Sequence, residues 1–205
     1  MKLFNERPIS VVFQETFGRA INEVHAINEY GFNKENLQNL TTEIYNVYKE
    51  KSIEVDFTKK SARVEMEQIS GKYFPADYDV NRNQNYPCAK VVWTFKIIKG
   101  SKFLDTFPKN NSFKPINVYV DRGNNLLEVY YQTLYAREEL SDQIKQEVKS
   151  WIADLVPKIE NTISLINDEI SEFNNAMKNK VEEEIIKRVK EIEKKNQQND
   201  DLADF

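Results

Sequence analysis

The sequence contains few of the residues from which catalytic and metal sites are usually built. Its 205 residues include one cysteine, Cys88, and one histidine, His25. A single cysteine cannot form a disulfide within the chain, and it excludes a metal site made of thiolates alone. A single histidine leaves little basis for a zinc site or a histidine-based triad. We therefore expect no catalytic residue, no bound metal and no cofactor on this chain.

Glycine, proline and long apolar runs are scarce as well. Five glycines and six prolines exclude collagen, flexible low-complexity sequence and glycine-rich phosphate loops used in bulk. The N-terminus carries charges where a signal peptide needs its apolar stretch. No run approaches the roughly eighteen apolar residues that a membrane span requires. We expect a cytoplasmic protein without a membrane partner.

Hydrophobic and charged residues are plentiful, at 40% and 30% of the chain. This balance is typical of a soluble protein with a real core and a solvated surface. The net charge of −4 gives no overall positive field that would attract nucleic acid or anionic lipid. The length predicts one domain, or one domain with an appendage.

Residues 8–51 are predicted to form a helical hairpin. Pro8 suits a first helical turn and Gly31 a helix end, while Asn33 is a candidate N-cap for the second helix. Apolar residues recur at steps of three and four, so each helix is apolar on one side only and must cover something. These residues are Ile9, Phe13, Phe17, Ala20, Val24 and Ile27, then Leu37, Leu40, Ile44 and Val47.

After this hairpin the apolar period changes to two, which indicates β-strands. A turn is predicted at residues 58–60 and a long surface loop over residues 70–88. Pairing in meander order gives a mainly antiparallel sheet of about five strands, and the fold class is α+β. The predicted strands are residues 53–57, 63–67, 89–98, 115–121 and 126–135.

Residues 138–196 have an uninterrupted helical pattern. As one rod they would span about 90 Å, more than the width of a domain of this size. We expect a first helix on the sheet and a second that folds back or pairs with another chain, with breaks at Pro157 or Asn174-Asn175. The expected organisation is an α+β core over 1–137, a helical oligomerisation segment over 138–196 and a flexible tail or linker over 197–205.

The apolar stripe of this segment narrows after Val181 to a seam flanked by charges. Such a seam is typical of helices that pair between chains, although packing on the first half of the same helix is the alternative. We predict a homo-oligomer that associates through this seam. Its predicted interface residues are Ile166, Ile170, Phe173, Met177, Val181, Ile185, Val189 and Ile192.

A second candidate surface combines lysines with aromatic residues, a pattern found in proteins that bind nucleic acid. In the alternative interpretation the aromatics belong to the core and the lysines keep an edge strand soluble. The lysines are Lys96, Lys99, Lys102, Lys109 and Lys114, and the aromatics are Trp93, Phe103, Phe107 and Phe113.

Two enzymatic hypotheses have less support. Glu65 and Glu67 share a strand face, but a restriction-type nuclease needs a lysine two residues further on, where this chain has Ile69. Alternating acids on a two-stranded ribbon are usually its solvated face. A nucleophilic pair of Cys88 with His25 has no local support, and a buried thiol is the expected state of Cys88.

The segment Leu165-Ile166-Asn167-Asp168-Glu169-Ile170-Ser171-Glu172-Phe173-Asn174-Asn175 precedes a charged helix containing Lys187-Arg188. Together with the hairpin at 115–135, it resembles an N-terminal module of bacterial multidomain proteins that are suspected of antiviral defence. In that family a variable effector follows, such as a Toll/interleukin-receptor or restriction-endonuclease-like domain. The resemblance covers about residues 90–195. Because this chain ends at Phe205, it implies an effector outside these residues or a module that acts alone.

These observations favour a non-catalytic sensing or oligomerisation module that sets the assembly state of an effector. Its expected partners are further copies of itself and a C-terminal effector domain or a partner protein. The alternative is a nucleic-acid-binding module that uses the lysines between Lys96 and Lys114.

Overall fold

The computed structural model describes residues 1–32 and 36–203, and it divides into two compact units. The sheet unit comprises Met1–Arg7 and Ile53–Ile166, and the helical unit comprises Pro8–Ser52 and the chain from Asn167 onward. This division differs from the expected domains, because the N-terminal hairpin groups with the distal part of the C-terminal helix. No helix among the described residues combines the length and apolar character needed to cross a bilayer.

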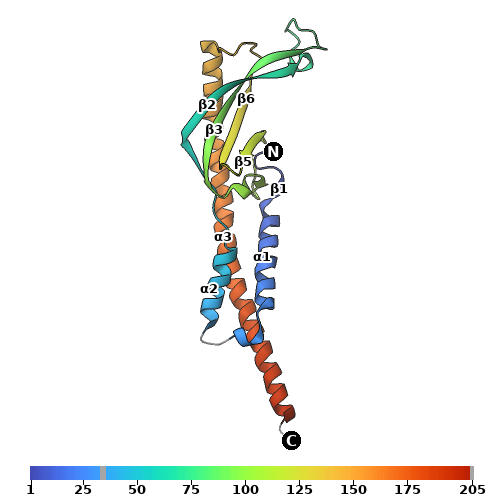
Figure 1. The fold of residues 1–205 in the computed structure, drawn as a ribbon, viewed down its shortest axis with the longest axis vertical. Helices are drawn as coiled ribbons and strands as arrows, with labels where there is room; N and C mark the ends of the chain where they lie inside the picture. The colour runs from blue at the N-terminus through green and yellow to red at the C-terminus, as the bar shows by residue number, and fades with distance from the viewer. Residues whose placement is uncertain (33–35, 204–205) are drawn as a thin grey trace. The chain divides into compact units, whose positions relative to one another are not determined.

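The sheet unit is built on a four-stranded antiparallel sheet of order β2-β3-β6-β5 (Figure 1). The predicted α+β class is therefore confirmed, with four strands in this sheet where about five were expected. β1 and β4 form a separate two-stranded sheet. The strands are β1 (Arg7–Pro8), β2 (Glu54–Ser70), β3 (Asn85–Lys99), β4 (Thr106–Phe107), β5 (Val118–Asp121) and β6 (Leu126–Gln132).

The predicted hairpin around residues 58–60 is wrong, because β2 runs through this segment as one strand paired with β3. The register jumps from Asp56 opposite Lys96 to Lys60 opposite Phe95, so residues 57–59 bulge out of the ladder. The Asp56 carboxylate accepts hydrogen bonds from the backbone N–H of Thr58 and of Lys59, at 3.0 and 3.2 Å. These bonds stabilise a local turn within the strand, which explains why the sequence resembles a hairpin turn.

One face of the sheet forms the core of this unit with the first part of helix α3 (Asp142–Ala203). Alternate residues of β3 from Val91 to Ile97 are buried, as are Leu127 and Val129 of β6. The Trp93 and Trp151 rings lie 5.8 Å apart and join the sheet to α3, as expected for its first half. The core residues include Val91, Trp93, Phe95, Ile97, Leu127, Val129, Ile152, Leu155 and Ile159.

The C-terminal helix is continuous from Asp142 to Ala203. The predicted breaks at Pro157 and at Asn174-Asn175 are therefore wrong, and residues 197–203, which were predicted to be a flexible tail or linker, are helical. No glycine or proline follows Pro157, so local propensity does not end the helix in that stretch. The ammonium of Lys195 also lies 2.8 Å from the Glu29 carboxylate within the helical unit.

The helical unit packs α1 (Ile9–Ala26) and α2 (Leu37–Tyr48) against the distal part of α3 (Figure 1). Helix α1 ends at Ala26 rather than near Gly31, and a short 3-10 helix occupies Glu29–Gly31. The candidate cap Asn33 lies outside the described residues. Val47, predicted on the inward face of α2, is exposed. The buried cluster consists of Ala20, Val24, Ile44, Met177, Val181 and Ile185.

Asn174 fastens α3 to the chain that follows α2. Its side-chain oxygen accepts the Glu50 backbone N–H at 2.8 Å, and its amide nitrogen donates to the Glu50 carbonyl at 2.9 Å. The buried Glu50 carboxylate in turn accepts the Thr16 hydroxyl at 2.7 Å. Next to it, the Phe173 ring stacks on Phe13 with centroids 4.4 Å apart. The Phe-Asn pair that resembles the defence-module motif thus has a structural role here.

Replacing Asn174 with alanine is expected to lower the free energy of unfolding by about 1–3 kcal/mol, because two backbone groups of Glu50 lose their partner. Urea denaturation followed by circular dichroism measures this loss. The exposed neighbour provides the control: Asn175→Ala is expected to be neutral or slightly stabilising, since alanine favours a helix. Equal effects of the two substitutions would contradict the anchoring role of Asn174.

Candidate ligand-binding groove

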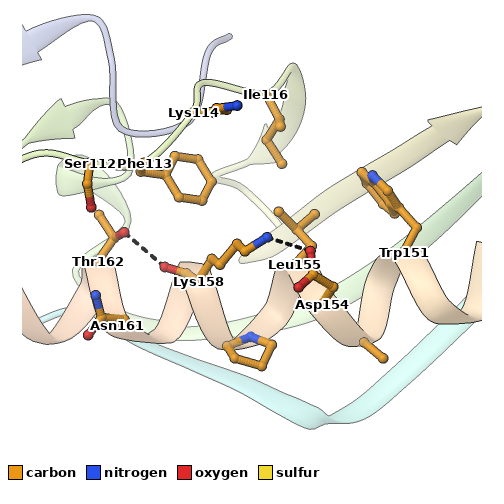
Figure 2. Close-up of a pocket in the computed structure, with 12 residues that line it drawn as sticks. Ser112, Phe113, Lys114, Ile116, Trp151, Asp154, Leu155, Lys158, Asn161 and Thr162 are labelled. Carbon is orange, nitrogen blue, oxygen red and sulfur yellow. Dashed lines mark hydrogen bonds and ion pairs between the residues drawn. The ribbon is translucent and has the colours of Figure 1, made fainter.

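A groove of about 680 Å³ lies in the sheet unit between helix α3 and the segment that precedes β5. Figure 2 shows Phe113 and Ile116 facing Leu155 and Lys158 across it, with Trp151 at one end. The remaining lining residues are Ser112, Lys114, Ala153, Asp154, Pro157, Asn161 and Thr162. Such a depression, with an apolar wall and a few polar groups, is the usual form of a ligand site.

The loop side of the groove is held by the first residues of the chain. The Asn111 side chain donates to the Phe4 carbonyl at 3.1 Å and accepts the Phe113 N–H at 3.0 Å. The buried Phe4 ring meets Phe113 edge to face, with centroids 5.4 Å apart. The backbone N–H of Leu3 donates to the Ile116 carbonyl at 3.0 Å. These contacts fix Phe113 and Ile116, so the apolar wall is preformed.

The helix side is held by aromatic packing against the sheet. Trp151 contacts Trp93 and also Tyr131, whose ring centroid lies 5.1 Å away. The Tyr131 hydroxyl donates a hydrogen bond to the Glu147 carboxylate. This bond, together with burial, raises the pKa of Tyr131 to about 12, so the phenol remains protonated at neutral pH. The helix is thereby fixed to the sheet beside the groove.

The polar groups of the groove suit an anionic ligand with an apolar part. The Lys158 ammonium forms an ion pair with Asp154 one turn earlier, and Lys114 extends from an exposed position on the opposite side. Asn161 and Ser112 add an amide and a hydroxyl. Phe113, Ile116 and Leu155 offer the surface for a ring or alkyl chain. The groove thus combines an apolar wall with two ammonium groups, one carboxylate and neutral polar groups.

The predicted interface residues of the C-terminal helix lie largely inside the protein. Ile166, Ile170, Met177, Val181 and Ile185 are buried, while Phe173, Val189 and Ile192 are partly buried. Within the helical unit, helices α1 and α2 cover the stretch from Met177 to Ile185. The seam prediction is therefore corrected for Phe173, Met177, Val181 and Ile185: these side chains form intramolecular contacts, because the hairpin supplies the apolar surface that a second copy was expected to supply.

The predicted basic region does not form a stacking platform. Phe103 is fully buried and Trp93 is 6% exposed, so neither ring can stack on a base. The Lys99 ammonium lies 3.1 Å from the Glu54 carboxylate, and that of Lys102 lies over the Phe103 ring. Lys96 and Lys109 are exposed, and Lys114 lines the groove. The lysines thus take several separate roles. Of the four predicted aromatic residues, Phe107 and Phe113 are half-buried and keep part of their rings accessible.

The residues of the enzymatic hypotheses are engaged elsewhere. Glu65 lies 2.7 Å from Arg63, and Glu67 lies 3.0 Å from Lys90, so both acids have cationic partners. Burial raises the pKa of the Cys88 thiol, which favours the unreactive protonated form. His25 lies 3.1 Å from Glu184 in the helical unit. Over residues 1–32 and 36–203, no three acidic, histidine or cysteine side chains gather as a metal site would require.

Sequence reasoning did not find the groove, because its two sides lie about forty residues apart in the chain and share no motif. The one local signal was the i,i+4 spacing of Asp154 and Lys158, which is common on helix surfaces. Comparisons with protein-family models, with curated proteins and with solved structures find no match for this chain.

Proposed function

We propose that this chain is a non-catalytic sensing and assembly module. In this proposal the sheet unit binds a small ligand in the groove between Phe113 and Lys158, and self-association of the chain controls an effector. The effector is either attached to the chain or a separate partner. The ligand class is an aromatic or aliphatic group that carries one anionic substituent, such as a carboxylate, phosphate or sulfonate.

The observation that carries the proposal is the composition of the groove. A preformed apolar wall lies beside the Lys114 and Lys158 ammonium groups and the Asp154 carboxylate that pairs with Lys158, so the groove keeps a net positive charge. A site of this kind recognises a ligand by shape and charge together. The resemblance of residues 165–175 to defence modules supports the assembly part, because in that family such a module precedes a variable effector. A Toll/interleukin-receptor or restriction-endonuclease-like domain is the kind of effector that we propose.

The ligand class is tested with anilinonaphthalene sulfonate, an aromatic anion whose fluorescence rises in apolar sites. We expect saturable binding, with energy transfer from Trp151 at the end of the groove. Lys114→Glu and Lys158→Gln are each expected to weaken this binding by roughly threefold to tenfold, because an attractive charge is lost or reversed. Dye titrations at fixed ionic strength measure the dissociation constants.

Lys72→Glu is the control, since it makes the same charge change as Lys114→Glu at an exposed lysine outside the groove. It is expected to leave dye binding unchanged. Binding that does not saturate, or that responds equally to Lys72→Glu and Lys114→Glu, would contradict a ligand site in the groove.

The nucleic-acid alternative makes a different prediction. Lys114 and the half-buried Phe113 are the members of the basic region that favour it, because both face the groove. An oligonucleotide would bind with an affinity that falls steeply with salt, and Lys99→Glu together with Lys102→Glu would weaken it further. That result, combined with no saturable dye binding, would replace the small-ligand proposal.

A further inference from the structure

Strand β2 lies at one edge of the sheet and pairs only with β3 in the order β2-β3-β6-β5. It is 17 residues long, and an edge strand directs alternate N–H and C=O groups away from its sheet. The bulge at residues 57–59 and the neighbouring lysines interrupt one end, which is a common protection of exposed edges. Residues 61–68 contain no bulge, proline or lysine, and their charged residues Arg63, Glu65 and Glu67 alternate with apolar ones.

This part of the edge also carries an apolar strip, formed by Ala62, Val64 and Met66. These residues alternate with the charged ones and belong to the sheet face that α3 covers, yet Met66 is 40% exposed and Ala62 is exposed. Beside Ala62 and Val64 lies an apolar groove of about 420 Å³, whose other walls include Trp93 and Val148. The strip therefore continues the core to the surface of the sheet unit.

We propose that a second copy of this chain pairs with β2 through its own β2, antiparallel, with Val64 opposite Val64. This inference rests on the proposed assembly function and names its surface. In this register Arg63 of each copy lies opposite Glu65 of the other, and Ala62 lies opposite Met66. Charge therefore meets opposite charge on one face of the joined sheet, and the two apolar strips meet on the other face.

Other antiparallel registers that keep the two faces matched are less favourable. Shifting the centre to Arg63 places two arginines opposite each other, and shifting it to Glu65 does the same with two glutamates. Centring on Met66 places Glu65 opposite Glu67. Like charges directly opposite on neighbouring strands destabilise a sheet. The sequence of β2 thus complements itself best about Val64, which is the symmetry that a two-fold dimer requires.

Sedimentation velocity over a range of protein concentrations tests the proposal. We expect the wild-type chain to form dimers and Met66→Lys to raise the dimer dissociation constant by roughly tenfold or more, since each dimer carries the added charge twice. The control Ile98→Lys changes another exposed apolar side chain, which lies near the end of β3, and is expected to leave the dimer unchanged.

The register is tested with two matched charge reversals. Glu65→Lys places a lysine opposite Arg63 and is expected to weaken the dimer, whereas Glu67→Lys faces Ser61 and is expected to have a smaller effect. Glu65→Lys removes an ion pair with Arg63 of the same chain, and Glu67→Lys removes one with Lys90. Because each variant loses one such pair, the difference between their dimer dissociation constants reports the contact between copies. Circular dichroism verifies that the variants remain folded.

Two results would overturn the inference, and they differ in what they leave standing. A dimer that is indifferent to Met66→Lys would exclude the β2 edge but keep the proposed assembly function. A chain that stays monomeric up to submillimolar concentration would overturn both the β2 dimer and the proposed assembly function. The proposed ligand site in the groove would be unaffected, because the dye titration tests it separately.

Discussion

Replacing Ile185 with aspartate is expected to destabilise the helical unit by roughly 4 kcal/mol or more. Ile185 is 1% exposed and packs in the cluster formed by α1, α2 and α3. The substitution removes a buried aliphatic side chain and leaves a carboxylate in an apolar site, and each change alone is costly. Urea denaturation monitored by far-ultraviolet circular dichroism measures the loss of stability.

The next residue along the helix supplies the control. Ile186 is 42% exposed, so Ile186→Asp is expected to change stability by less than about 1 kcal/mol. If the seam were an interface between chains, Ile185→Asp would instead dissociate an oligomer and leave the monomer stable. The midpoint of unfolding would then depend on protein concentration for the wild type but not for the variant. A pronounced concentration dependence of that kind would contradict the packing described here.

Replacing Trp151 with alanine is expected to destabilise the sheet unit by roughly 3 kcal/mol. Trp151 contacts Trp93 and Tyr131, so its removal opens a space between α3 and the sheet. Because Trp151 also forms one end of the groove, the same change is expected to abolish the saturable binding of anilinonaphthalene sulfonate. Urea denaturation followed by the fluorescence of Trp93, the other tryptophan of the chain, reports this unit directly.

Trp151→Phe distinguishes packing from ligand contact. Phenylalanine keeps most of the aromatic volume, so we expect about half of the stability loss or less, with dye binding weakened but measurable. A stability of Trp151→Ala within about 0.5 kcal/mol of the wild type would contradict the role of Trp151 in fixing α3 to the sheet.

The sequence predicted best those elements in which local pattern and tertiary environment agree. The strand at residues 89–98 was predicted correctly, because β-branched and aromatic residues recur there with period two. The hairpin at 115–135 was also predicted, and Asn125 between its paired strands adopts φ 57°, a conformation that asparagine tolerates better than most residues. Helices α1 and α2 followed from their apolar stripes.

Sequence-based predictions were wrong where one local pattern is compatible with two structures. Asp56 and Thr58 favour a turn, but here the turn is a bulge inside a strand, because β3 is long enough to pair on both sides of it. Asn174 has poor helix propensity and suggested a hinge, but its two hydrogen bonds to Glu50 make it an anchor. Such outcomes depend on partners that are distant in the chain, and no local window contains them.

The apolar seam shows the same limit at a larger scale. Periodicity established that residues from Ile166 to Ile192 need cover, but it could not identify which surface provides it. The structure assigns the cover around Met177, Val181 and Ile185 to the hairpin of α1 and α2. The groove could not be predicted for a related reason. Phe113 and Lys158 come to line the same groove only after the strands between them have folded.

Hydrogen–deuterium exchange measured by mass spectrometry, from low micromolar to submillimolar protein, tests most directly whether the chain covers its own seam. The account predicts strong protection of the amides from Met177 to Ile185 that is the same at every concentration, while protection of residues 61–67 in β2 rises with concentration. Protection of the α3 segment that is weak in dilute protein and rises with concentration would contradict it.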